Sequence, residues 1–287
     1  MAQGWLALSW PARSNTPSIR PKQPRQAARR GAGDLATAHA VARPVTALGD
    51  SFVRGVVIPA HAHERAQLIF AVRGTMTVRG AGRLWILPPS HALWVPGGVV
   101  HEVRMNGPVE MRTLYVEPRL AQRVRRECEV LFVSPLLREL IVRAMEIRPD
   151  YDERGKDGRL MRLILDEIAA LPAQPLSLRM PRDARLLRLC ERVLGDLSAS
   201  ESIAELAASA GLSGRTVIRR FPRETGLSFA RWQSQARLLK AFELFDAGQS
   251  VTRVALELGF SSPSAFAKMF RRALGKAPTA MTRALPV

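Results

Sequence analysis

The spacing of apolar residues divides the chain into a strand-rich part and a helical part. From Ser51 onward, short apolar runs such as 67–72 alternate with Gly and Pro, which predicts a sandwich or small barrel of short strands over 49–120. After Pro118 the apolar period lengthens to that of helices. Two apolar stripes there predict two amphipathic helices within 121–172, at Leu136, Leu137, Leu140, Ile141, Ala144 and Met145, and at Leu160, Leu163, Ile164, Ile168 and Leu171.

These two helices have two interpretations, because an apolar stripe beside a barrel can pack on it or form a dimer surface. Three prolines, Pro172, Pro175 and Pro181, then predict a linker over 173–182. From there to residue 287 the pattern is helix and turn. We therefore expect an α+β chain of two domains: a β-barrel with two associated helices, and an all-α domain over 183–287.

One sequence pattern occurs twice in the helical domain. The segment 202–207 leads to Gly211 and Ser213, and the segment 250–255 leads to Gly259 and Ser261, with a constant offset of 48 residues. Each copy predicts a short helix, a turn at a glycine with positive φ, and a serine that caps the next helix. This order is typical of a helix-turn-helix unit, so the sequence predicts two of them.

The helix after each turn is the expected DNA-binding element. In the first copy we expect Val217, Ile218 and Phe221 to pack inward. Arginine donates two hydrogen bonds to guanine and threonine contacts bases or the thymine methyl, so the outer face can discriminate bases. The candidates for base readout are Ser213, Arg215, Thr216 and Arg219.

The second copy has shorter outward side chains, and we expect it to contact the phosphate backbone. A helix predicted over 229–247 separates the copies and spans roughly 30 Å. This length is near the 34–36 Å between successive major-groove faces, so one rigid helix can hold both copies in adjacent grooves. The candidates for backbone contacts are Arg220, Ser262, Ser264, Lys268, Arg271 and Arg272.

The chain has a net charge of +18, and residues 181–287 carry 17 basic and 9 acidic side chains. Such a balance favours a polyanionic partner, and no apolar run approaches the about 20 residues of a membrane span. Cys128 and Cys190 lack the spacing of metal ligands, which favours buried thiols in a reducing, cytoplasmic setting.

Residues 1–48 are basic and show no hydrophobic period, and we expect a disordered tail there in preference to a targeting peptide. A start codon placed too far upstream is the other alternative.

The second copy resembles a known signature: Ala255-x3-Gly259-Phe260-x3-Ser264-x-Phe266-x3-Phe270-Arg271-x3-Gly275-x2-Pro278 is similar to that of the AraC/XylS transcriptional regulators. The resemblance implies binding to double-stranded promoter DNA, as an activator or a repressor. It also implies an N-terminal small-barrel (cupin) sensor for a small-molecule effector, a homodimer, and RNA polymerase as a partner if the protein activates. Met281, Thr282 and Arg283 depart from the usual aromatic and Arg of the family.

The strand-rich part resembles the cupin motifs. His61-Ala62-His63 with Gln67 and Gly74 is similar to the first motif, with Gln in place of Glu, and 96–101 resembles the second, which ends at His101. We expect His61, His63, Gln67 and His101 to line an effector pocket, and His61, His63 and His101 suit a divalent transition metal such as Zn, Fe, Ni or Cu. A metal-free pocket is favoured, because sensors of this family mostly bind small molecules without metal.

An alternative function is a metal-dependent cupin enzyme, a dioxygenase or isomerase, fused to a DNA-binding domain. Gln67 in place of the usual acidic ligand argues against it. We therefore expect no catalytic residue, and we predict a transcriptional regulator.

Overall fold

The computed structural model describes residues 41–174, 176–275 and 277–279. The sequence-based expectations for residues 1–40, including the tail, and for 281–283 lie outside these ranges. The chain forms two compact units with a boundary between Ser177 and Leu178. This boundary falls inside the linker predicted over 173–182, and β11 (Ser177–Arg179) contains it.

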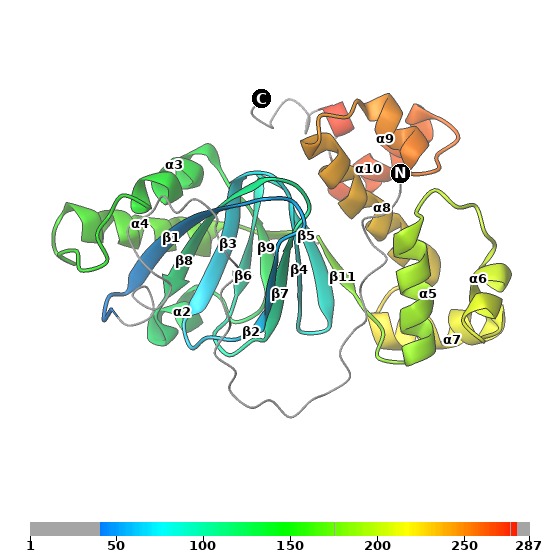
Figure 1. Cartoon of the computed structure of the whole chain (residues 1–287), viewed down its shortest axis with the longest axis horizontal. Helices are drawn as coiled ribbons and strands as arrows, with labels where there is room; N and C mark the ends of the chain where they lie inside the picture. The colour runs from blue at the N-terminus through cyan, green and yellow to red at the C-terminus, as the bar shows by residue number, and fades with distance from the viewer. Residues whose placement is uncertain (1–40, 175, 276, 280–287) are drawn as a thin grey trace. The chain divides into compact units, whose positions relative to one another are not determined.

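The N-terminal unit consists of two antiparallel sheets and three helices (Figure 1). The first sheet has the order β1 (Val45–Phe52), β8 (Val109–Val116), β3 (Ala66–Arg73), β6 (His91–Val95), β9 (Glu129–Phe132) and β10 (Ala173–Gln174). The second sheet contains, in order, β5 (Arg83–Leu87), β4 (Met76–Gly80), β7 (His101–Met105) and β2 (Val57–His61). The expectation of a strand-rich N-terminal domain is confirmed.

β1 begins before the range 49–120 that the sequence assigned to the barrel, and β9 and β10 of the first sheet lie after that range. β1 begins at Val45, within the range 1–48 assigned to the tail, and pairs along its whole length with β8. β9 lies within the segment 121–172 expected to be helical, and it pairs with β6. Gly49 and Asp50 weaken the local strand signal of β1, and a strand of four residues such as β9 is too short to show a distinguishing period.

The helices of the N-terminal unit pack on one face of the first sheet. α2 (Pro118–Val124), α3 (Pro135–Ala144) and α4 (Lys156–Ala170) lie on the side of β1 and β8, away from β4 and β5 (Figure 1). Ile141 of α3 and Ile164 of α4 join Phe70 of β3 in one apolar cluster. The helices are therefore part of the core, although Leu136 and Leu163 stay 52% and 42% exposed.

The period of two in β3 and β8 decides what lies on the other face of the first sheet. Leu68 and Leu114 belong to the cluster beneath the helices. Since successive side chains of a strand alternate in direction, their neighbours Gln67, Thr113 and Tyr115 lie on the opposite face. All three are buried, so polar groups lie in the interior of the N-terminal unit.

The C-terminal unit is all helical. Its helices are α5 (Ala184–Gly195), α6 (Ile203–Ser209), α7 (Gly214–Thr225), α8 (Phe229–Asp246), α9 (Val251–Glu257) and α10 (Pro263–Leu274). α8 is central and contacts α7, α9 and α10. It has 18 residues and is therefore about 27 Å long.

Aromatic residues attach each helix-turn-helix unit to α8. Near the start of α8, Phe221 of α7 lies 5.2 Å from Phe229 and 5.7 Å from Trp232, measured between ring centroids. Near its end, Phe270 of α10 lies 5.8 Å from Phe242. Such edge-on and tilted contacts add to the burial of the rings, so α8 holds the two units at its two ends.

Candidate functional site

Both predicted turns contain a glycine in the left-handed region. The φ angles of Gly211 and Gly259 are 68° and 76°, values that non-glycine residues rarely adopt. In the first copy Ser202 and Glu205 form a capping box at the start of α6. The Ser213 hydroxyl accepts from the amide of Thr216 and caps α7. The local signals in the sequence therefore specify these helix ends.

The offset of 48 residues does not extend to the second helix of each unit. α7 begins at Gly214 and α10 at Pro263, which is one residue later than the offset predicts. Ser262, and not Ser261, caps α10 by accepting from the amide of Ala265 at 3.2 Å. The cause is Pro263, because its fixed φ and missing N–H favour the first position of a helix.

The exposed side of α7 differs from the prediction at one residue. Val217 and Phe221 are fully buried, as expected, but Ile218 is 62% exposed and does not pack inward. Arg215 and Arg219 are also exposed. Residues three and four apart share one face of a helix, so Arg215, Ile218 and Arg219 form a single surface, which we call the reading face.

The two hydroxyls at the start of α7 bind each other. The Oγ atom of Ser213 lies 2.9 Å from Oγ1 of Thr216, and Thr216 is half-buried. They border the reading face, but they have a local structural role as well.

Arg220 has a different environment from the other arginines of α7. Its guanidinium donates to the carboxylate of Asp183 at 2.8 Å and lies 3.8 Å from Glu224. These partners belong to the same unit, so we do not include Arg220 among the proposed DNA contacts.

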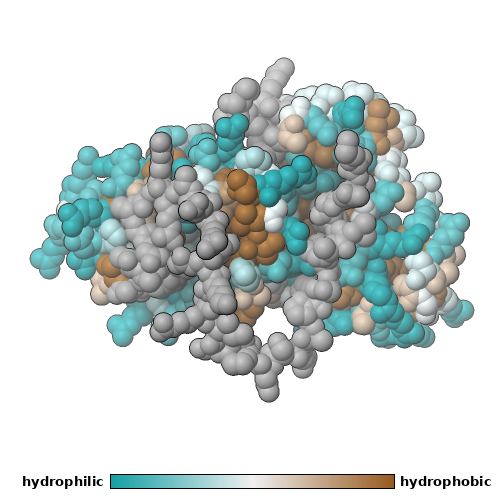
Figure 2. Space-filling view, in the orientation of Figure 1, coloured by the Kyte–Doolittle hydropathy of each residue, from teal (hydrophilic) through white to brown (hydrophobic). Residues whose placement is uncertain are grey.

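α10 presents a mainly basic exposed surface. Ser264, Lys268, Arg271 and Arg272 are exposed, whereas Ser262 is half-buried as the cap. On the face shown in Figure 2, most of the surface over α6 and α7 is likewise hydrophilic, with isolated apolar side chains. With the corrected offset of 49, Ser264 and Lys268 take the places of Arg215 and Arg219.

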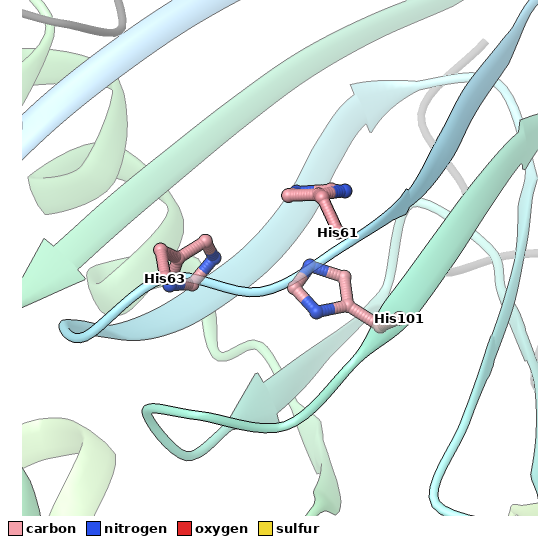
Figure 3. Close-up of side chains that lie close together, drawn as sticks. All are labelled: His61, His63 and His101. Atoms are coloured by element: carbon pink, nitrogen blue, oxygen red, sulfur yellow. The ribbon is translucent and has the colours of Figure 1, made fainter. Parts of the chain in front are cut away.

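The three predicted histidines of the N-terminal unit do come together. His61 ends β2, His63 follows it, and His101 begins β7; Figure 3 shows their rings grouped around a common space. One ligand nitrogen from each lies within 4.8 Å of the others. We call these residues the histidine cluster.

Each ring of the cluster is oriented by a backbone carbonyl. A carbonyl oxygen can only accept, so each Nδ1 carries the hydrogen, and in a neutral ring Nε2 keeps its lone pair. Burial lowers the pKa of His101 to about 4, and burial also lowers the pKa of His61, so both are neutral near pH 7. The Nδ1 atoms of His61, His63 and His101 lie 2.8, 2.6 and 2.9 Å from the carbonyl oxygens of Pro59, Arg65 and Val99.

Gln67 of β3 connects the cluster to the first sheet. Its Oε1 atom lies 3.0 Å from Nε2 of His63 and 3.0 Å from Nε2 of His101. Its Nε2 atom donates to Thr113 Oγ1 at 2.9 Å and to the Tyr115 hydroxyl at 3.3 Å. All four predicted pocket residues therefore lie together, between the two sheets.

Sequence reasoning did not identify the contacts that Thr113 and Tyr115 make with Gln67. The signal was present in 111–116, where the period of two places these polar residues on one face of a strand. Trp85, Trp94 and Phe70 are buried core residues. His91 lies outside the cluster, and burial lowers its pKa to about 4.

Comparisons with protein-family models match both units. Residues 53–153 match the AraC-like ligand binding domain and residues 206–284 match a helix-turn-helix domain. The HTH-type transcriptional regulator NimR of Escherichia coli strain K12 is 32% identical over 220 residues, which cover 77% of this chain and 80% of NimR. RhaS of Klebsiella pneumoniae, an HTH-type transcriptional activator, is 34% identical over 97 residues, covering 33% of this chain and 35% of RhaS.

Solved structures give weaker overall similarity. A structure of ToxT from Vibrio cholerae has a TM-score of 0.38 at 10% identity and covers 85% of this chain and 100% of ToxT. The DNA-binding domain of AdpA in complex with a target DNA has a TM-score of 0.32 at 37% identity, covering 34% of this chain and 88% of that domain. Among the described residues, no helix has the length and apolar character to cross a membrane.

The named relatives do not support the cupin-enzyme alternative, since they are transcriptional regulators. Two family models match the two units in the expected order, and the match to NimR extends over most of both chains. The chain therefore belongs to the AraC family of DNA-binding transcriptional regulators that have an N-terminal ligand-binding domain.

Proposed function

We propose that this regulator recognises promoter DNA in a sequence-specific manner through α7, and that a small molecule bound in the N-terminal unit controls its action. The observation that carries the proposal is the reading face, where Arg215, Ile218 and Arg219 are exposed on one side of α7. Val217 and Phe221 anchor the other side in the core. α7 thus presents base-reading side chains from a fixed support.

The chemistry of the reading face suits the major groove. An arginine donates two hydrogen bonds to O6 and N7 of guanine, and an apolar side chain contacts the C5-methyl group of thymine. Arg215 or Arg219 can therefore select guanine, and Ile218 can select a neighbouring thymine. Ser213 and Thr216, at the start of α7, are additional candidates for base contacts.

α10 supplies affinity more than sequence discrimination. Lys268, Arg271 and Arg272 are exposed cations, and contacts with phosphates add affinity without reading bases. Affinity that depends on such contacts falls steeply with salt.

The effector pocket is proposed at the histidine cluster and Gln67, because these polar groups converge between the two sheets. Effector binding would shift the equilibrium between two states of the N-terminal unit.

We place the contact of a homodimer on α3 and α4, where Leu136 and Leu163 remain exposed. RNA polymerase is a further partner if the target promoters are activated, and a promoter-binding protein acts in the cytoplasm, where the chromosome lies.

The test is a footprint on DNA upstream of the gene for this protein, with intact protein at low salt. We expect protection, and we expect Arg215→Ala and Arg219→Ala to lose about 1–3 kcal/mol of preference for the protected site over a scrambled site. Arg188→Ala, an exposed arginine of α5, removes the same charge and should leave this preference unchanged. Absence of protection on any upstream fragment, or full preference in both variants of α7, would overturn the proposal.

A further inference from the structure

The two helix-turn-helix units contact each other directly, in addition to their attachment to α8. A Cβ atom at Gly259, in the turn of the second unit, would lie 2.5 Å from the carbonyl oxygen and 2.9 Å from the Cα atom of Ser198. Ser198 belongs to the segment 196–199, which leads from α5 towards α6 of the first unit. The second turn therefore lies against the segment that leads into the first unit, at a distance that only glycine permits.

Arg237, in the middle of α8, joins the same two parts of the chain. Its Nε–H donates to the carbonyl oxygen of Leu197 at 3.0 Å and to that of Leu258 at 3.2 Å. Leu197 lies in the segment 196–199, and Leu258 is at the end of α9, where carbonyls have no partner within the helix. A charged guanidinium makes stronger hydrogen bonds than a neutral donor. One side chain of α8 thus holds both units.

Asp196 stabilises the segment that Arg237 binds. One oxygen of its carboxylate accepts from the amides of Ser198 and Ala199 at 2.9 and 3.2 Å, and from the Ser198 hydroxyl at 2.6 Å. These hydrogen bonds, with that of the Ser198 hydroxyl as the largest cause, lower the pKa of Asp196. Such bonds between a side chain and the nearby backbone stabilise a turn locally. The turn that presents the carbonyls of Leu197 and Ser198 therefore has its own support.

The hydrogen bonds of Arg237 fix an angle that the aromatic contacts with α8 do not. Phe221 and Phe270 attach the two units to α8 by apolar packing, which is largely non-directional. Hydrogen bonds require a defined geometry, and Arg237 lies between the two aromatic attachments along α8. We propose that Arg237 and the segment 196–199 form a bridge that fixes the positions of α7 and α10 relative to each other.

The bridge makes the spacing of the contacted DNA segments a determinant of specificity. Each base pair of B-DNA advances the major groove by about 3.4 Å and about 34°. A base pair inserted between the segments that α7 and α10 contact therefore moves one segment away from a rigid pair of helices. Arg237 is a positioning residue in this role, because it acts through α7 and α10. The role in recognition rests on the proposed function, whereas the rigidity of the bridge does not.

The rigidity is measured in the full-length chain by double electron–electron resonance between spin labels on Arg215→Cys and Lys268→Cys. Both positions are exposed, Cys190 is buried, and Cys128 is replaced by serine. Excess unlabelled chain restricts the measurement to distances within one chain. We expect one narrow distance distribution, and a distribution at least about twofold broader after Arg237→Met.

Two further variants complete this measurement. Arg231→Met makes the same change at an exposed arginine of α8 and should leave the distribution narrow. Asp196→Ala alters an exposed side chain that supports the turn, so it should retain the fold and broaden the distribution. A broad distribution in the wild type, or a narrow one in a folded Arg237→Met chain, would overturn the proposal. If Arg237→Met does not fold, a narrow distribution in Asp196→Ala overturns it.

DNA with one base pair inserted between the two protected groove segments tests the consequence for recognition. We expect the wild type to lose about tenfold in affinity and Arg237→Met to lose no more than about threefold. Destabilisation alone lowers the affinity for both DNAs by the same factor, so the ratio of the two affinities reports the spacing requirement. An equal ratio in wild type and variant would overturn this role. A rigid chain that protects no DNA would contradict only the proposed function.

Discussion

Arg220 of α7 donates to the carboxylate of Asp183 at 2.8 Å, and Asp183 is the residue that caps α5. The other oxygen of this carboxylate accepts from the amides of Arg185 and Leu186 at 2.9 and 3.2 Å. Glu224 of α7 in turn accepts from the amide of Asp183 at 2.9 Å. The start of α5 is therefore held by two side chains of α7, and we expect the neighbouring Arg219 and Arg220 to have different roles.

Replacing Arg220 and Arg219 separately should distinguish these roles. Arg220→Ala removes a charged hydrogen bond from a carboxylate that is 16% exposed, so we expect the free energy of unfolding to fall by roughly 1–3 kcal/mol. Arg219→Ala should change stability by less than about 0.5 kcal/mol, because its side chain is exposed, and should weaken promoter binding instead. Urea denaturation and DNA titration measure the two effects, and the reverse pattern would contradict the assignment.

Ile218 should contribute to specificity through the thymine methyl group. We expect Ile218→Ala to lose about 1 kcal/mol of affinity for the protected site and to leave stability nearly unchanged, since the side chain is 62% exposed. Deoxyuridine lacks this methyl group, so replacing the contacted thymine should weaken the wild type but not the variant. Leu256→Ala on α9 is the control, because Leu256 is equally exposed and lies outside the reading face. Equal sensitivity of wild type and Ile218→Ala to deoxyuridine would exclude this contact.

The turn glycines of the two copies should differ in their tolerance of alanine. Both have positive φ, but a Cβ atom at Gly259 would lie 2.5 Å from the carbonyl oxygen of Ser198, whereas one at Gly211 would meet nothing within 4 Å. We expect Gly211→Ala to cost about 1 kcal/mol from backbone strain alone. Gly259→Ala should cost roughly 1–3 kcal/mol more, because the clash is with backbone. Thermal and urea unfolding of both variants measure the difference, and equal losses would show that the turn relaxes.

Local signals in the sequence account for most of the helical unit. The caps at Ser202 and Ser213 and the glycine turns act within four residues, so the sequence alone predicted these helix ends. Ile218 was placed wrongly because adjacent apolar residues of a helix cannot both be assigned a face from their type. The one-residue shift of α10 was also readable, since Pro263 favours the first helical position.

The candidate pocket was only partly predictable, for a different reason. The spacing within two short motifs identified His61, His63 and His101, but Thr113 reaches Gln67 through the pairing of β3 with β8, 46 residues apart in sequence. The register between distant strands has no local signature. Gln67 stands where the first cupin motif has Glu, and the sequence does not show which groups its amide contacts. The hydrogen bonds with His63, His101 and Thr113 appear only in the structure.

A charge on α4 should test the proposed homodimer. Leu163 is 42% exposed, and a glutamate there would place an unpaired charge in an apolar contact. We expect the wild type to be dimeric and Leu163→Glu to be monomeric at the same concentration, by size exclusion with light scattering. Val53→Glu introduces the same charge at a residue that is 71% exposed outside α3 and α4, and it should stay dimeric. A monomeric wild type, or a dimeric Leu163→Glu, would contradict this placement.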